Sequence, residues 1–150
     1  MPRLFIQKNK KRGKYYESCK KNIMYCNDPI GCSKNKSVDK KTFCELVSEI
    51  TGETVTVPSD APFGFTIGAD DSYCEIDTNP FDIDDYSSST IRSYNEQMNK
   101  KLGLPDYLYN DMLNTSYSQG KQEEIFDKIK VKYYYHPDKG LNVNYYRIGK

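Results

Sequence analysis

The sequence predicts an α+β fold, with a mostly antiparallel sheet, about three helices on one face of it, and a β-hairpin at each end of the chain. Apolar residues recur at helical spacing in three segments and alternate at strand spacing in several others. The 150 residues are expected to form a single domain, residues 1–150, because a chain of this length buries roughly 70% of its unfolded surface.

The N-terminal third is expected to contain a basic hairpin, a loop and a helix. Residues 4–6 and 14–16 flank a turn at 9–13, whose glycine can adopt a left-handed corner. Residues 18–37 carry the turn signals of a loop. A helix capped by Asp39 follows and ends near Gly52, and its apolar face consists of Phe43, Leu46, Val47 and Ile50.

The middle of the chain is expected to hold short strands and an acidic connector. Residues 54–57 indicate a strand that stops at Pro58, and residues 63–67 can pair with residues 73–77 across a turn at 68–72. The connector, residues 81–86, interleaves acidic residues with apolar residues that we expect to anchor it, namely Phe81, Ile83 and Tyr86.

Two adjacent helices and a final hairpin complete the expected fold. One of the serines at 87–89 caps the first helix, whose buried stripe is Ile91, Tyr94, Met98 and Leu102. Pro105 begins the second helix at its first position, and the stripe there includes Leu104, Leu108, Met112 and Leu113. After a loop at 116–120, residues 129–135 and 141–145 alternate strongly on either side of a turn at 136–140.

The turn sequence His136-Pro137-Asp138-Lys139 resembles the tripeptide and following lysine with which chaperone J-domains engage a partner ATPase. In that family the motif lies on a loop between two antiparallel helices. Here the flanking segments have the periodicity of strands, and only ten residues follow Gly140. Because this periodicity outweighs a match of four residues, we interpret the segment as a hairpin turn.

Charge is strongly segregated along the chain, although the total is only +1. Residues 1–41 carry a net charge of +9, residues 42–90 contain eleven Asp/Glu and no Lys or Arg, and residues 91–150 carry a net charge of +3. Such a pattern bears on partners and association rather than on fold. We expect two oppositely charged faces that both reach solvent.

The acidic face is the first candidate binding site. Its carboxylates are Asp70, Asp71, Glu75, Asp77, Asp82, Asp84 and Asp85. Aligned on a rigid surface, they can imitate DNA phosphates, which carry one charge per roughly 1.7 Å of duplex, and so occupy the nucleic-acid channel of another protein. A solvated acidic surface is the alternative. A metal site is disfavoured because the segment lacks the glycine and distant glutamate of a calcium loop.

The basic segment is the second candidate site. Lysines suit phosphate contact, and the neighbouring tyrosines suit stacking on bases. The residues concerned are Lys8, Lys10, Lys11, Arg12 and Lys14. A solvated hairpin tip and a docking surface for an acidic protein are the alternatives.

Neither a cofactor nor an enzymatic activity is expected. Four thiols, those of Cys19, Cys26, Cys32 and Cys44, are candidates for a zinc site, but the six, five and eleven residues between them lack the tight spacing of structural zinc ligands. We therefore expect free thiols. The chain has a single histidine, in a turn, and no Gly-x-Ser-x-Gly sequence, so no catalytic set is recognised.

The predicted function is inhibition of another protein by charge complementarity. Small size, many residues of the kinds that AT-rich codons encode (Lys, Asn, Ile and Tyr) and segregated charge resemble, in style, the proteins that phages and mobile elements carry against host defences, such as anti-CRISPR and anti-restriction proteins. The expected partner is a nucleic-acid-handling protein, and the expected location is the cytoplasm of a prokaryotic host, because no secretory signal or apolar run of about 20 residues is present. The alternatives are a nucleic-acid-binding module that uses the basic segment, and head-to-tail self-association of opposite charges.

Overall fold

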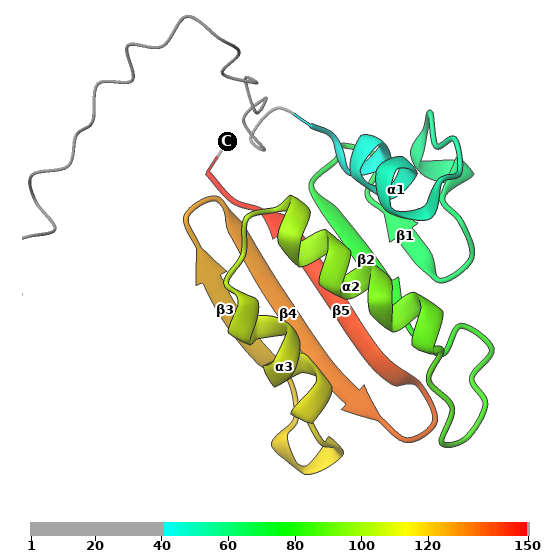
Figure 1. The fold of residues 1–150 in the computed structure, drawn as a ribbon, viewed down its shortest axis with the longest axis vertical. Helices are drawn as coiled ribbons and strands as arrows, with labels where there is room; N and C mark the ends of the chain where they lie inside the picture. The colour runs from blue at the N-terminus through cyan, green and yellow to red at the C-terminus, as the bar shows by residue number, and fades with distance from the viewer. Residues whose placement is uncertain (1–40, 150) are drawn as a thin grey trace, which may run out of the picture. The chain divides into compact units, whose positions relative to one another are not determined.

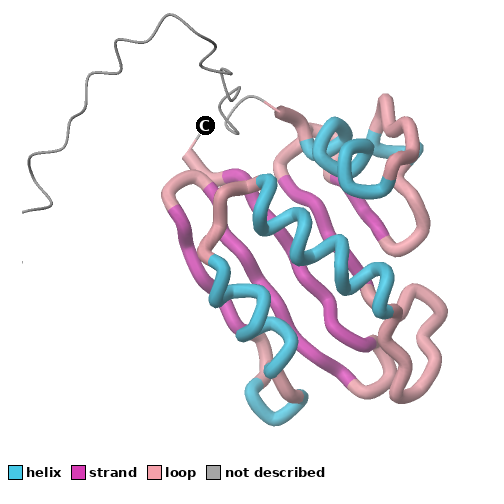
Figure 2. The backbone as a smooth tube through the Cα atoms, viewed as in Figure 1, coloured by secondary structure: helices cyan, strands magenta, loops and turns pink. Residues whose placement is uncertain are grey.

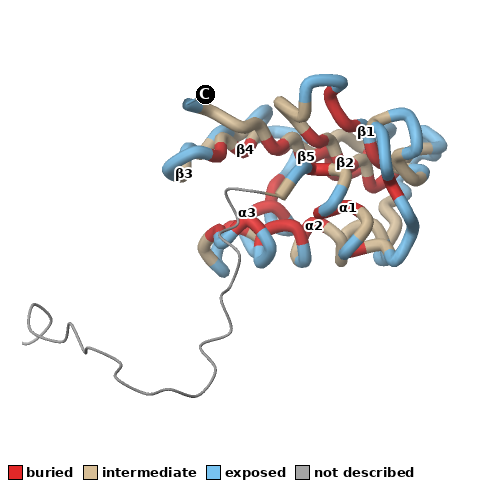
Figure 3. The backbone as a smooth tube through the Cα atoms, turned by 90° about the horizontal axis from the view of Figure 1, so that it is seen from above, coloured by how far each residue is buried: buried red, intermediate tan, exposed pale blue. Residues whose placement is uncertain are grey.

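The structure is a computed structural model that describes residues 41–149. The expected N-terminal hairpin, the loop at 18–37 and the Asp39 cap lie outside the described residues. Within them, five strands form one antiparallel sheet in the order β1-β2-β5-β4-β3, and three α-helices lie on one of its faces (Figures 1 and 3). The α+β class, the antiparallel sheet and the three helices are therefore confirmed.

The elements follow one another in a simple order. Helix α1 (Phe43–Thr51) precedes strands β1 (Phe65–Ile67) and β2 (Tyr73–Asp77), which are followed by α2 (Ser89–Lys101) and α3 (Asp106–Asn114). The sheet is completed by β3 (Gln122–Phe126), β4 (Ile129–His136) and β5 (Gly140–Arg147), and short 3-10 helices occupy Pro58–Asp60 and Tyr117–Gln119.

Helix α1 begins one turn later than Asp39. Its N-cap is Thr42, whose hydroxyl accepts a hydrogen bond from the Glu45 N–H at 3.2 Å, while the Glu45 carboxylate accepts one from the Thr42 N–H at 2.8 Å. This reciprocal capping box satisfies two backbone donors that the first turn leaves unpaired. The left-handed Gly52 ends the helix, and the apolar face of α1 is buried as expected.

Residues 54–57 are not a strand. The Val55 N–H donates to the Ser48 hydroxyl of α1 at 3.0 Å, so its hydrogen bond goes to a helix side chain instead of a neighbouring strand. The segment then enters the 3-10 helix at Pro58, and the Asp60 carboxylate accepts a hydrogen bond from the Thr56 hydroxyl at 2.7 Å. Local side-chain hydrogen bonds have replaced the sheet pairing that alternation predicted.

The buried face of α2 is partly polar. Ser88 caps the helix, and Met98 and Leu102 are buried as expected, but Ile91 and Tyr94 are only half-buried. Asn95 and Asn99 take the buried positions instead, and the Tyr145 hydroxyl of β5 donates a hydrogen bond to Asn99 Oδ1 at 2.8 Å. A buried polar group is tolerated where such a partner exists.

Helix α3 shows two further differences from the expectation. Pro105 is its N-cap rather than its first helical residue. Leu104, Leu108 and Met112 are buried, whereas Leu113 is 43% exposed and does not belong to the core stripe.

Strands β4 and β5 form the longest antiparallel pair of the sheet. Their register runs from Ile129 opposite Arg147 to His136 opposite Gly140, and the Lys139 N–H donates to the His136 carbonyl at 3.1 Å in the connecting turn. Strand β3, which the sequence did not indicate, pairs with the outer edge of β4. The inner face of the sheet packs on the helices and forms the core.

Candidate protein-binding surface

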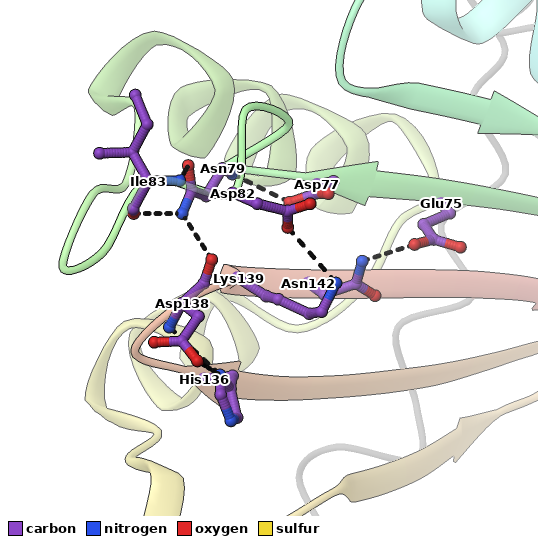
Figure 4. A network of polar contacts seen from close by, with 9 residues as sticks. All are labelled: Glu75, Asp77, Asn79, Asp82, Ile83, His136, Asp138, Lys139 and Asn142. Carbon is purple, nitrogen blue, oxygen red and sulfur yellow. Dashed lines mark hydrogen bonds and ion pairs between the residues drawn. The ribbon is translucent and has the colours of Figure 1, made fainter.

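The connection from β2 to α2, residues 78–88, is a long loop (Figure 2), and its root is buried. Thr78 and Asn79 are both fully buried. The Thr78 hydroxyl donates to the Leu141 carbonyl and accepts from the Leu141 N–H, both at 2.9 Å. The Asn79 amide group donates to the Ile83 carbonyl at 2.6 Å and to the Asp138 carbonyl at 3.1 Å (Figure 4). These bonds fix the loop to the β4–β5 turn.

The backbone of the loop is held in a defined path beyond this root. Asp82 and Asp85 adopt left-handed backbone angles, with φ of 50° and 55°. Aspartate tolerates this region better than most residues, because its short polar side chain bonds locally. The Asp85 N–H donates to the Pro137 carbonyl at 2.9 Å, which ties the far side of the loop to the same turn.

The apolar residues of the loop are exposed, contrary to the expectation that they anchor it to the core. Phe81 is 64% exposed, and its ring packs against that of Phe63, itself 60% exposed, with 4.5 Å between the ring centroids. Ile83 and Tyr86 are also exposed. Asn79 and Thr78 anchor the loop in their place, so its apolar side chains remain in solvent.

Three carboxylates lie within this apolar segment. Asp82, Asp84 and Asp85 are all exposed. Lys139 contacts Asp82 at 3.3 Å, and within residues 41–149 neither Asp84 nor Asp85 forms an ion pair or a side-chain hydrogen bond. We call the set Phe63, Phe81, Asp82, Ile83, Asp84 and Asp85 the acidic–aromatic surface.

The other acidic candidates bond within the domain. The Asp70 carboxylate accepts a hydrogen bond from the Ser72 N–H at 3.1 Å. Asp71 accepts from the Phe43 N–H at 2.5 Å and from Arg147 Nε at 3.1 Å, so it joins α1 to the end of β5. Glu75 accepts from the Asn142 amide at 2.5 Å. Asp70 and Asp71 precede β2 and Asp82 to Asp85 follow it, so the strand separates the two groups.

Asp77 lies at the root of the loop rather than on its outer surface. It is half-buried, and its carboxylate accepts a hydrogen bond from the Asn79 N–H at 2.9 Å. Burial raises the pKa of Asp77, and the negative charges of Glu75 and Asp82 act in the same direction. Asp77 therefore belongs to the structural support of the acidic–aromatic surface.

The basic candidates and three of the cysteines lie outside the described residues. These are Lys8, Lys10, Lys11, Arg12, Lys14, Cys19, Cys26 and Cys32. Cys44 lies half-buried on α1, where burial and the charges of Asp71 and Asp60 raise the pKa of its thiol. In residues 41–149, no three His, Cys, Asp or Glu side chains are grouped so as to hold a metal ion.

Comparison with known proteins assigns no family to the chain. No protein-family model matches it, and neither does any curated protein or solved structure. Among the helices of residues 41–149, none has both the length and the apolar character needed to cross a bilayer.

Proposed function

We propose that this protein is a non-enzymatic inhibitor that binds another protein through the acidic–aromatic surface. The observation that supports this function is the exposed Phe63–Phe81 pair beside three exposed carboxylates. Exposed apolar clusters rimmed by polar groups are typical of protein interaction sites, and aromatic residues dominate the binding energy of such sites. The buried root at Thr78 and Asn79 lowers the entropic cost of binding, because the loop is already ordered.

The chemistry of the surface indicates the kind of partner. An aromatic pair followed by exposed carboxylates in the same loop complements a basic groove with an apolar depression, the kind of surface with which proteins hold nucleic-acid phosphates and bases. In this proposal the partner is a nucleic-acid-handling protein of a CRISPR or restriction system, and this chain acts in the cytoplasm of a prokaryotic host on behalf of a phage or mobile element.

The proposal is tested by affinity capture from cells that carry such defence systems. Wild-type protein is compared with the triple variant Asp82→Asn, Asp84→Asn and Asp85→Asn, and separately with Phe81→Ala. Asparagine tolerates the left-handed angles at 82 and 85, so the amide variant keeps the loop backbone while removing its charge. We expect each variant to retain the partner at least about tenfold less, which corresponds to about 1.4 kcal/mol of binding free energy.

A matched control carries the same change of net charge elsewhere. The variant Glu53→Gln, Asp106→Asn and Asp111→Asn alters three exposed acids outside the acidic–aromatic surface and is expected to bind as the wild type does. Excess duplex DNA should displace the captured protein. Equal retention by wild type and both surface variants, or a captured protein that DNA does not displace, would contradict the proposal.

A further inference from the structure

The face of the sheet opposite the helices carries no helix of the described chain (Figure 3). Alternate residues of each strand point to this side, because successive side chains of a strand point to opposite faces. On β2 and β5, for example, Cys74, Ile76, Val143 and Tyr145 are buried toward the helices, whereas Tyr73 and Tyr146 are half-buried on the other side. We call this second side the open sheet face.

The strand register places aromatic and basic side chains in rows across the open sheet face. Tyr73 lies opposite Tyr146, which lies opposite Lys130, which lies opposite Ile125. The rings of Tyr73 and Tyr146 are 6.1 Å apart. This row therefore presents two neighbouring rings, a lysine and an exposed isoleucine from four different strands.

The cations of this face lie above its rings. Lys130 Nζ and Lys132 Nζ lie 5.3 Å and 5.8 Å from the centroid of the Tyr146 ring. Lys121 Nζ lies 5.3 Å from that of Tyr134. Lys132 also pairs with Glu123 at 3.0 Å, whereas Lys130 forms no ion pair within residues 41–149. The lysines are thus within reach of any ligand that stacks on the tyrosines.

Rings in register with lysines beside them match the chemistry of a single nucleic-acid strand. Bases stack on aromatic side chains while the backbone phosphates contact lysines, and every base has a face to stack. Stacking of a base on an aromatic ring contributes more binding free energy than a cation over an exposed ring does. A base can therefore displace the lysine ammonium group from the ring, and the ammonium group can then contact the phosphate of that nucleotide.

Acceptor groups between the rings favour RNA over DNA. Glu75 lies on the same face and accepts a hydrogen bond from Asn142 with one carboxylate oxygen. Asn144 lies opposite Glu75 in the strand register, and its side-chain amide donates a hydrogen bond to Asn142 Oδ1 at 2.6 Å. The second Glu75 oxygen and the Asn144 carbonyl can accept from a ribose 2′-hydroxyl, a donor that DNA lacks.

We propose that the open sheet face binds single-stranded RNA, with bases on Tyr73, Tyr146 and Tyr134 and phosphates on Lys130, Lys132 and Lys121. This inference is independent of the proposed inhibitor function, because it uses a different surface. It is independent of the basic N-terminal segment as well.

The test measures binding of the full chain to a labelled single-stranded RNA of about 12 nucleotides by fluorescence anisotropy over a range of salt concentrations. Tyr146→Val keeps a strand-forming residue while removing the ring, and should weaken binding about tenfold. Lys130→Gln with Lys132→Gln should reduce the slope of log affinity against log salt by about 1.4, since each phosphate contact to a single strand contributes about 0.7.

Matched variants identify the surface responsible. Lys100→Gln with Lys101→Gln makes the same charge change on α2, across the sheet, and should leave the slope unchanged. A third variant removes charge from the basic segment by the substitutions Lys10→Gln, Lys11→Gln and Arg12→Gln. In this background Tyr146→Val should still weaken RNA binding about tenfold. The Asp82, Asp84 and Asp85 amide variant should bind RNA at least as tightly as wild type, which separates this test from that of the inhibitor function.

Several outcomes would overturn the inference. The first is the absence of RNA binding below about 10 μM at low salt. The second is an equal reduction of the salt slope in the Lys130/Lys132 and Lys100/Lys101 variants. The third is binding to DNA of the same sequence that is as tight as binding to RNA. Sedimentation that shows the Tyr146→Val and Lys130/Lys132 variants dissociating a dimer would instead assign the face to a second copy of the chain. Circular dichroism confirms that each variant is folded.

Discussion

Tyr145 joins the sheet to α2 through a single hydroxyl. The side chain is fully buried, and its hydroxyl lies 2.8 Å from Asn99 Oδ1 and 3.3 Å from Asn95 Oδ1. A phenol can donate only one proton, so the nearer Asn99 carbonyl is its main acceptor. The hydroxyl therefore compensates for a polar group that the core would otherwise leave unpaired.

Tyr145→Phe is expected to destabilise the domain by about 1–3 kcal/mol, because it leaves the buried Asn99 carbonyl without this donor. Denaturant unfolding followed by circular dichroism measures the change. Tyr117→Phe is the control: Tyr117 is 62% exposed, and its substitution should stay within about 0.5 kcal/mol of the wild type. A Tyr145→Phe variant as stable as this control would contradict the assigned role.

The same residues show why the core of α2 was only partly predictable. Hydrophobic periodicity identifies Met98 and Leu102 correctly, since both are apolar and buried. It cannot identify Asn95 and Asn99, because their burial depends on a tyrosine about fifty residues away in the chain. An asparagine within a helical stripe can be predicted to be buried and hydrogen-bonded only when the strand that packs against that stripe is known.

At the scale of elements, the β4–β5 turn supports the acidic–aromatic surface. Gly140 adopts φ of +64°, and a Cβ at this position would lie 2.9 Å from Asn79 Cβ, 2.9 Å from Thr78 Oγ1 and 3.0 Å from the Tyr86 carbonyl. The turn and the loop root are therefore in direct contact, and glycine is required by conformation and by space together.

Gly140→Ala is expected to destabilise the domain by about 1–2 kcal/mol from the left-handed backbone, with a further cost of about 1–3 kcal/mol from overpacking against the loop root. Gly103→Ala is the matched control, because φ there is +67° but nothing lies within 4 Å of the added Cβ. Thermal and denaturant unfolding of both variants separate the two contributions. Equal destabilisation of both variants would show that the loop root yields to the added methyl group.

Strand β3 shows what pattern alone misses at this scale. Its sequence, Gln122 to Phe126, has little apolar alternation, and the strand forms because its backbone pairs with the edge of β4. Two tyrosine hydroxyls, those of Tyr107 and Tyr133, donate to the Glu124 carboxylate at 3.1 Å each. By contrast, the alternation in residues 129–147 is strong on both strands, which is why the sequence indicated β4 and β5.

For the whole molecule, tyrosine ionisation links stability to alkaline pH. Burial, reinforced by the hydrogen bond to Glu124, raises the pKa of Tyr133 to about 12, and burial also raises the pKa of Tyr145. Tyrosines of the unfolded chain ionise near pH 10. Between these values the folded state holds more protons than the unfolded state, so the free energy of unfolding falls as pH rises.

We therefore expect these two groups to leave stability unchanged below about pH 10. Between about pH 10 and pH 12 stability should decline, with about 1.4 kcal/mol per pH unit from Tyr133 and an additional decline from Tyr145. Guanidinium unfolding at several pH values measures the decline. Tyrosinate absorbance of the folded protein shows the delayed ionisation directly. Constant stability up to pH 12 would contradict this account.

The structure also shows how the acidic residues of the chain are distributed in space. The sequence indicated one acidic face, but the structure divides its residues between internal bonds, as at Asp71 and Glu75, and the exposed loop that holds Asp82, Asp84 and Asp85. Residue order alone could not separate these roles, because each depends on a partner that the fold supplies, such as Arg147 or Asn142. The exposed Phe63–Phe81 pair likewise joins residues that pattern analysis treats separately.

The sheet order has a consequence for how copies of the molecule behave in a crowded solution. Its two outer strands are β1, only three residues long, and β3, which presents adjacent glutamates at 123 and 124. A short edge strand offers few backbone groups to a foreign strand, and charged side chains on an edge strand disfavour its pairing with another edge. Concentrated solutions should therefore resist fibril growth by strand addition, even though the exposed Phe63–Phe81 pair lies close to β1.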